Sequence, residues 1–278
     1  MTLPIVDAHQ HYWDRALFTY PWMSPDLGIL LRDYLPLDLR PLLERNGVHK
    51  TVVVQALSSP AETDWLLELA AQFDFIAGVV GWADLTAPGL GQTLDRLMLN
   101  PRFKGLRHQV QDEPDDAWIL RGDVQRGLGE LARRNLPYDL LLHPRHLPLV
   151  PQVAEQHPDL RLVIDHLAKP PIAQGRLEPW ATDLRQAALW PNVYCKLSGM
   201  ATEAGAGWVD ADLAPYVKVA VEAFGYERLM FGSDWPVCLI AGSYERVIGA
   251  LRRALGPLSA EDEARMFGGN AIEVYRLF

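Results

Sequence analysis

Cysteine is nearly absent from this chain of 278 residues, which contains only Cys195 and Cys238. Two cysteines without a C-x-x-C spacing exclude a disulfide scaffold, and they favour a reducing compartment. The N-terminus has no basic region followed by an apolar segment, so we expect no signal peptide. These absences together predict a cytoplasmic protein.

Basic runs and long apolar runs are missing as well. The chain has 26 Lys and Arg residues against 35 Asp and Glu residues, which gives a formal net charge of -9. Without clustered cations, neither nucleic acid nor an anionic membrane surface is an expected partner. No stretch of about 18 apolar residues is present, so no transmembrane helix is expected.

Short apolar segments instead alternate with amphipathic ones, and hydrophobic residues make up 49% of the chain. Eight segments have the composition of buried strands: 5–11, 51–55, 75–80, 103–107, 138–143, 160–166, 192–197 and 229–236. Most intervening segments carry apolar residues on one helical face, as helices packed on a sheet do. Eight such alternations without an internal linker predict an α/β fold, a single (β/α)8 TIM barrel domain over residues 1–278.

Ligand-type side chains end several of these strands. The first ends in His9-x-His11, whose side chains share one face because side chains alternate along a strand. Such a pair suits a metal or a polarised substrate, although by itself it also occurs as two surface histidines. The other such residues at strand ends are Arg107, His108, His143, His166 and Asp234. Since one face of a barrel collects all C-terminal strand ends, we predict a common active site there.

Five motifs resemble those of the amidohydrolase superfamily: VDAHQHYWD (6–14), KGLRH (104–108), VIDHLAKP (163–170), KLSG (196–199) and FGSDWP (231–236). They are most similar to its branch of sugar-acid and dicarboxylate lactonases, to which L-fuconolactonases and L-rhamnonolactonases belong. The resemblance spans nearly the whole chain and implies a hydrolase that opens the lactone ring of a sugar acid. The alternatives on the same barrel are a zinc-dependent decarboxylase or amidohydrolase, and a lactone isomerase.

The resemblance also implies a metal site. The ligands of the superfamily map to His9, His11 and Asp234, with His143 or His166 as a further imidazole. Imidazole and carboxylate ligands favour zinc over magnesium or calcium. The fourth strand offers no obvious lysine for carbamylation, so we expect at most one divalent ion. Some members of the branch work without metal, and the first two histidines would then hydrogen-bond the lactone.

Opening a lactone ring requires that water lose a proton, that the carbonyl be polarised and that the ring oxygen be protonated. We assign Asp234 as the general base, the alternative being a carboxylate that orients a histidine or caps a loop. Arg107, His108 or His166 would hold the carbonyl oxygen. Lys169 is a second cation suited to an oxyanion or to sugar hydroxyls.

An aromatic, proline-rich loop at 12–36 is expected to complete the substrate pocket. Its Trp13, Trp22 and Tyr34 offer flat faces to sugar C–H surfaces, and Trp235 is a further candidate. The same aromatics suit packing at the barrel end, and we expect only about half of the tryptophans to contact ligand. The negative charge of the chain favours a neutral sugar lactone as its small-molecule partner, and the sequence leaves open whether it forms a homo-oligomer.

Two local patterns concern the orientation of side chains and the ends of helices. In the seventh strand, alternation sends one of Cys195 and Lys196 inward and the other outward, without indicating which. At the C-terminus, Ser259 and Asn270 each precede an acidic residue by three positions. This spacing predicts N-caps for two closing helices, at 259–267 and 270–277.

Overall fold

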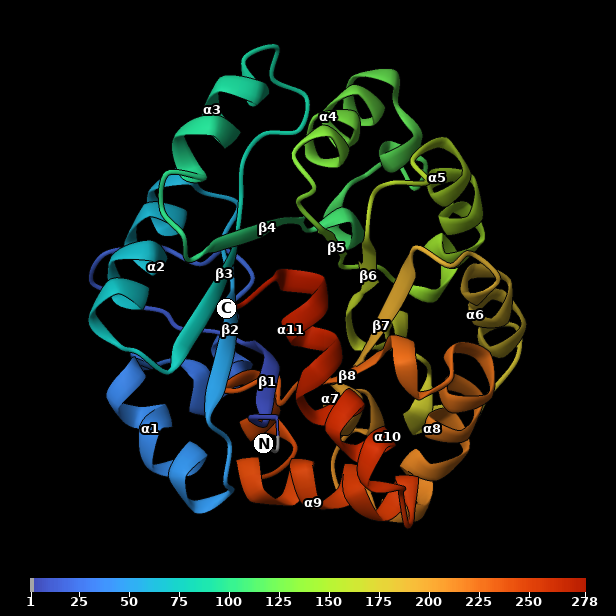
Figure 1. The fold of residues 1–278 in the computed structure, drawn as a ribbon. Coiled ribbons are helices and arrows are strands. Elements are labelled where there is room, and N and C mark those ends of the chain that lie inside the picture. The colour runs from blue at the N-terminus through green and yellow to red at the C-terminus, as the bar shows by residue number, and fades with distance from the viewer. Residues whose placement is uncertain (1–2) are drawn as a thin grey trace.

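Eight parallel strands form the centre of the protein in this computed structural model, which describes residues 3–278 (Figure 1). The strands are β1 (Val6–Gln10), β2 (Lys50–Val54), β3 (Ile76–Gly81), β4 (Phe103–His108), β5 (Tyr138–Leu140), β6 (Leu162–Ile164), β7 (Val193–Leu197) and β8 (Leu229–Phe231). Each pairs with the next in chain order. A parallel bridge between Gln10 and Trp235 then brings the two edges of the sheet together. The predicted (β/α)8 barrel is confirmed.

Helices surround this barrel. They are α1 (Pro36–Arg45), α2 (Pro60–Gln72), α3 (Leu90–Leu97), α4 (Gly122–Arg133), α5 (Val150–Gln156), α6 (Trp180–Ala188), α7 (Met200–Ala204), α8 (Asp210–Phe224), α9 (Tyr244–Leu255), α10 (Ala260–Ala264) and α11 (Asn270–Tyr275). Figure 1 shows α11 over the middle of the ring of strands. There Val274 and Tyr275 pack with Val6 and Ala8, so α11 covers the N-terminal end of the barrel. Within residues 3–278, no helix is both long and apolar enough to cross a membrane.

One extra residue in β1 determines where its histidines point. Asp7 pairs with Thr51 and Gln10 with Val53, so three steps along β1 match two along β2. Such a β-bulge shifts the alternation of side chains by one position. Asp7 accordingly accepts a hydrogen bond from Tyr244 of the outer helix α9, over 3.0 Å. His9, two residues later, points into the barrel toward side chains of β4 and β7.

The orientation that the sequence left open in β7 is also resolved. Cys195 belongs to the main hydrophobic core, together with residues of the surrounding helices. Lys196 directs its ammonium group into the barrel, where Nζ lies 2.5 Å from Asp139 Oδ2 of β5. Both charged side chains are fully buried. An ion pair therefore lies inside the barrel.

The two predicted helix caps near the C-terminus have different outcomes. Ser259 caps α10 by accepting the backbone N–H of Asp262, over 3.1 Å. Asn270 is not an N-cap, because a π-helical turn at Arg265–Gly269 joins α10 to α11 without a break. Its side-chain amide instead donates to the carbonyls of Tyr226 and Leu229, each over 2.7 Å. Asn270 therefore ties the closing helix to the start of β8.

Glu62 of α2 links stability to pH. It is fully buried, and its Oε2 accepts the backbone N–H groups of Ala56 and Leu57 just after β2. Burial raises the pKa of Glu62 to about 7, although these two hydrogen bonds oppose the shift. The folded state therefore binds this proton more tightly than the unfolded state. Its contribution to stability is complete below the ordinary pKa of 4.5 and is lost as pH rises through about 7.

We expect Glu62→Gln, which keeps one acceptor oxygen, to remove this part of the pH dependence. Between pH 5 and pH 8 the wild type should lose up to about 3 kcal/mol of unfolding free energy relative to the variant. Urea unfolding at four pH values in this range measures the difference. Parallel pH profiles for the two proteins would contradict the assignment.

Candidate active site

His9 and His11 direct their Nε2 atoms toward one another across 3.2 Å. The Nδ1 of His11 lies 2.7 Å from the Val54 carbonyl, which can only accept, so Nδ1 carries the proton. The Nδ1 of His9 lies 3.2 Å from Asp165 Oδ1. Burial lowers the pKa of His9 well below its ordinary value, so its ring is neutral, with its proton on Nδ1 facing Asp165. In this tautomer, a neutral ring of either histidine has its lone pair on Nε2.

Asp165, at the end of β6, is the anion that orients His9. Its carboxylate lies 3.1 Å from the Nζ of Lys196 and 3.1 Å from the Nη1 of Arg107. Burial opposes its ionisation, but His9, Lys196 and Arg107 outweigh burial and hold the pKa of Asp165 well below its usual range. A carboxylate behind a histidine fixes the tautomer of the ring and the direction of its free nitrogen.

His9, His11 and Asp234 fit the ligand set of one zinc ion. Asp234 Oδ1 lies 3.4 Å from the Nε2 of His11 and 4.0 Å from that of His9. Zinc bonds of about 2.0–2.1 Å place neighbouring ligands of a tetrahedral site about 3.3 Å apart. The three atoms lie within 4.8 Å of one another, and with both rings neutral and protonated on Nδ1 all three could bind one cation.

A second group of potential ligands, His9, Asp165 and His166, lies beside the first. Its carboxylate is already paired with Lys196 and Arg107, both within 3.1 Å. A further cation there would be repelled by both side chains. The site therefore has room for a single ion.

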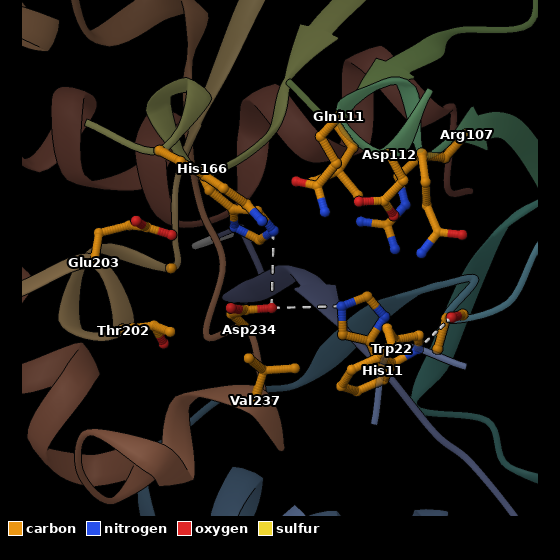
Figure 2. Close-up of a pocket in the computed structure, with 15 residues that line it drawn as sticks. His11, Trp22, Arg107, Gln111, Asp112, His166, Thr202, Glu203, Asp234 and Val237 are labelled. Carbon is orange, nitrogen blue, oxygen red and sulfur yellow. Dashed lines mark hydrogen bonds and ion pairs between the residues drawn. The ribbon is translucent and has the colours of Figure 1, made fainter. Parts of the chain in front are cut away.

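Asp234 follows β8 and stands between the imidazoles. Its Oδ1 lies 3.4 Å from the Nε2 of His11 and 3.8 Å from that of His166, contacts that Figure 2 shows as dashed lines. Burial opposes ionisation of Asp234, but His166, His11 and Lys169 hold its pKa below the usual value. Burial also lowers the pKa of His166 to about 4. At neutral pH, the carboxylate of Asp234 therefore faces a neutral ring of His166.

The backbone beside this carboxylate is unusual. Four consecutive residues, His166 to Lys169, have left-handed conformations with φ of 53° to 56°, and Asp234 has φ of 58°. Non-glycine residues adopt this conformation at a cost of about 1–2 kcal/mol each, and such strain concentrates at functional sites. Gly199 leaves the space that His166 needs, because its φ is +65° and a Cβ there would lie 2.8 Å from His166 Nδ1.

A cavity of about 170 Å³ opens in front of these groups. The predicted site residues that line it are His11, Trp22, Arg107, His166, Lys169 and Asp234. Sites for drug-sized ligands occupy about 300–1,000 Å³, so this cavity suits a smaller molecule. The structure thus brings most of the predicted catalytic residues to one pocket.

His108 does not join them, contrary to the expectation that it holds a carbonyl oxygen. Side chains alternate along β4, so Arg107 faces the pocket and His108 faces away. Both ring nitrogens of His108 are engaged elsewhere: Nδ1 is 3.0 Å from the Trp82 indole nitrogen and Nε2 is 2.7 Å from Glu113 Oε1. The ring also stacks on Trp118.

His143, expected as a further metal ligand, is likewise outside the site. It belongs to neither group of potential ligands found in residues 3–278, and it does not line the cavity. β5 ends at Leu140, so His143 lies three residues beyond the strand, at the start of the 3-10 turn Pro144–Leu149. The ring of His143 instead stacks with His146, with centroids 6.3 Å apart.

Of the four aromatic candidates, only Trp22 lines the cavity. Trp13, Tyr34 and Trp235 are at most 1% exposed and pack edge to face, with centroids 5.3–5.4 Å apart. The polar atoms of Trp13 and Tyr34 are used for backbone carbonyls of Arg32 and Ile29. These three residues pack together in the structure and do not line the cavity, contrary to the expected place of a substrate-binding residue.

Two sets of residues near the site were missed. The first is a charged network inside the barrel, in which Lys196 joins Asp165 to Asp139, and Asp139 accepts a hydrogen bond from Tyr275 of α11. The second is a set of polar residues that line the cavity: Gln109, Gln111, Asp112, Thr202 and Glu203. The second set lies just beyond β4 and β7, so strand-end position is the signal that could have found it.

Comparison with known proteins agrees with this geometry. Residues 6–277 match a protein family described as amidohydrolase. An L-fucono-1,5-lactonase of Burkholderia ambifaria is 42% identical over 98% of this chain and 95% of its own length. An L-fucono-1,5-lactonase of Burkholderia multivorans is 40% identical over 98% and 96%.

A crystal structure of an amidohydrolase from Burkholderia multivorans with bound zinc superposes with a TM-score of 0.93. It shares 40% identity and covers 99% of this chain and 100% of its own. Because the family match and these relatives cover nearly the whole sequence, the chain belongs to the amidohydrolase family.

Proposed function

We propose that this protein hydrolyses the lactone ring of a sugar acid, with Asp234 as the general base. The observation that carries the proposal is the buried carboxylate of Asp234, which lines a small cavity together with Arg107 and whose neighbours His166, His11 and Lys169 lower its pKa. The two L-fucono-1,5-lactonases that share 40–42% of the sequence support the same reaction. A single sheet, whose strands lie between Val6 and Phe231, supports one catalytic domain.

In the proposed reaction, Asp234 accepts one proton from water and later gives it to the ring oxygen. Asp234 takes a proton from water as the water oxygen attacks the lactone carbonyl carbon, and the carbonyl oxygen becomes an alkoxide. Arg107 stabilises that oxyanion as a fixed cation. When the alkoxide collapses, the bond from carbonyl carbon to ring oxygen breaks, and Asp234 returns its proton to the ring oxygen. The products are an alcohol and a carboxylic acid, which ionises in water.

A zinc ion, when bound by His9, His11 and Asp234, would supply Lewis acidity toward water or the carbonyl oxygen. His9 and His11 need no rearrangement for this role, since Asp165 and Val54 already fix their tautomers. Arg107 Nη1 lies 3.3 Å from the same nitrogen of His9 that would ligate zinc. Arg107 can therefore donate a hydrogen bond to His9 Nε2 when no metal is bound. This alternative partner is consistent with an enzyme that also works without zinc.

We expect elemental analysis of the purified protein to find at most one zinc per chain. The reason is that cations already neutralise the second group of potential ligands. His11→Asn should lower the zinc content, whereas His143→Asn should leave it unchanged. Two zinc ions per wild-type chain would refute this ligand assignment.

The charges of the cavity favour a neutral substrate. Its lining includes three carboxylates, Asp112, Glu203 and Asp234, against two cations. One of the cations, Arg107, is already paired with Asp165. A carboxylate on the substrate would therefore meet mostly negative charge in the cavity.

The test of the function is a screen of aldonolactones and uronolactones with a pH indicator, because hydrolysis releases a proton. We expect the highest rates with neutral, hydroxylated lactones. Product analysis must find the open acid rather than a lactone of another ring size. Turnover without net proton release would favour an isomerase and overturn the proposal.

Trp22→Ala is expected to raise KM about tenfold with little change in kcat. Trp22 lines the cavity from the first loop, and its indole N–H donates to the Ala56 carbonyl over 2.8 Å. A wall residue of this kind contacts substrate and transition state alike, so its loss weakens binding of both. Steady-state kinetics on the best lactone of the screen measures the effect. A fall confined to kcat would contradict this role.

We further propose that the protein works in the cytoplasm without a nucleic-acid or membrane partner. The net charge of -9 and the two free, buried cysteines support this placement.

A further inference from the structure

Two polar walls face each other across Asp234 in the cavity. Figure 2 shows Gln111 and Asp112 on one side and Thr202 and Glu203 on the other. The first pair follows β4 in a short 3-10 turn, and the second lies on α7 after β7. The ring-opening steps proposed above use none of these four side chains.

Both walls carry a buried polar atom without a hydrogen-bond partner. Within residues 3–278, Gln111 Oε1 and Thr202 Oγ1 are shielded from solvent and have no hydrogen-bond partner. Both residues line the cavity. Folded proteins pair nearly all of their buried polar atoms, so a ligand that fills the cavity lined by these two residues is expected to supply the missing partners.

The chemistry of the two walls selects the ligand group. An amide oxygen accepts a hydrogen bond, a threonine hydroxyl both donates and accepts, and the carboxylates of Asp112 and Glu203 accept two or more. An alcohol O–H matches all of these because it donates and accepts at one atom. A carboxylate on the ligand does not match, since it offers no donor to the two acids.

Lys169 and Glu203 offer groups of opposite charge to a ligand in the cavity. Burial raises the pKa of Glu203, and the nearby charge of Lys169 opposes that shift. Lys169 and Glu203 both line the cavity, so a hydroxyl between them can donate to the carboxylate and accept from the ammonium. A substrate with a hydroxyl at this position would therefore bind more tightly than one with a methylene there.

We infer that Gln111, Thr202 and Glu203 are specificity-determining residues that bind hydroxyl groups on opposite sides of the lactone carbonyl. The substrate class is then a carboxylate-free lactone with hydroxyls at both ends of the molecule. This inference rests on the proposed lactonase function.

The test combines removal of the side-chain group with removal of the substrate hydroxyls. Wild type, Gln111→Leu, Thr202→Val and Glu203→Gln are each assayed on a fully hydroxylated six-membered aldonolactone and on unsubstituted δ-valerolactone. The readout is the ratio of the two kcat/KM values. We expect this ratio to fall at least about tenfold in Glu203→Gln and about fivefold in the two neutral variants, because hydrogen bonds to charged groups are the stronger ones.

Three controls separate hydroxyl binding from damage to the pocket. Val237→Ala removes an apolar lining group and should lower both rates together, which leaves the ratio unchanged. Thr202→Ser keeps the hydroxyl and should restore the wild-type ratio. Glu222→Gln changes a carboxylate that is 51% exposed on α8 and should preserve the ratio.

The possible failures are distinguishable. Wild-type ratios in all three variants would overturn the inference while leaving the lactonase function in place. A wild-type enzyme that opens neither lactone would overturn the proposed function, and this inference with it.

Discussion

Asp234→Asn is expected to lower kcat on a sugar lactone by at least about 100-fold. The substitution keeps the shape of the side chain but removes the group that accepts the proton from water, and general-base catalysis contributes about 10²- to 10⁴-fold. KM should change little, since the lost interaction develops in the transition state. Steady-state kinetics on the best lactone measures both constants.

A loss of metal is the competing explanation, because Asp234 also belongs to the group that fits zinc. The two explanations separate when wild type and Asp234→Asn are compared again after chelation. A base defect keeps the same kcat ratio between the two proteins, whereas a metal defect makes them equal. If Asp234→Asn kept a near-native kcat, the base would be reassigned to His166, whose neutral imidazole can accept the same proton.

The common location of His9, His11, His166 and Asp234 could be predicted because it depends on topology alone. A parallel barrel brings every C-terminal strand end to one face, so knowing where the strands end suffices. His108 shows where this reasoning stops, since it follows Arg107 directly and alternation sends its side chain the other way. Strand-end position identifies the neighbourhood of the site, and side-chain direction decides which residues belong to it.

The bulge in β1 shows why direction is harder to predict. His9 is two positions after Asp7, and a regular strand would point both side chains to the same face. The extra residue sends Asp7 to α9 and His9 into the barrel. A bulge of this kind depends on how β1 pairs with β2, which the sequence of β1 alone does not reveal.

The sequence also does not reveal which aromatic residues of the loop at 12–36 line the cavity and which pack within the loop. Trp13 and Trp22 have the same chemistry and lie nine positions apart in one loop. Trp13 donates its indole N–H to Arg32 within the loop, whereas Trp22 reaches across to Ala56 after β2. Which of the two rings lines the cavity depends on the hydrogen-bond partner of each indole, and the residue type does not reveal that partner.

The charged network inside the barrel is the largest feature that sequence reasoning missed, and its contacts explain why. Lys196 and Asp139 are 57 residues apart, and Asp139 and Tyr275 are 136 residues apart. No local pattern links them. The network nevertheless connects α11 at one end of the barrel to Asp165 and His9 at the other.

Lys196→Met is expected to destabilise the protein by about 3–5 kcal/mol. The variant keeps the volume of the side chain but leaves Asp139 and Asp165 buried without the ammonium group that lies 2.5 Å and 3.1 Å from them. Removing one partner of a buried ion pair has an effect of this size because the remaining charge is uncompensated. For a chain of this length, the midpoint of thermal unfolding should fall by about 10 °C.

Two comparisons determine whether charge, and not packing, is the cause. Adding Asp139→Asn to Lys196→Met removes one uncompensated carboxylate and should recover part of the lost stability, since residues in one network are coupled. Lys218→Met, at a site 77% exposed on α8, should leave the unfolding midpoint unchanged within about 1 °C. If the double variant were less stable than Lys196→Met by the full effect of Asp139→Asn alone, the two residues would be independent. The ion pair between Lys196 and Asp139 would then contribute nothing to folding.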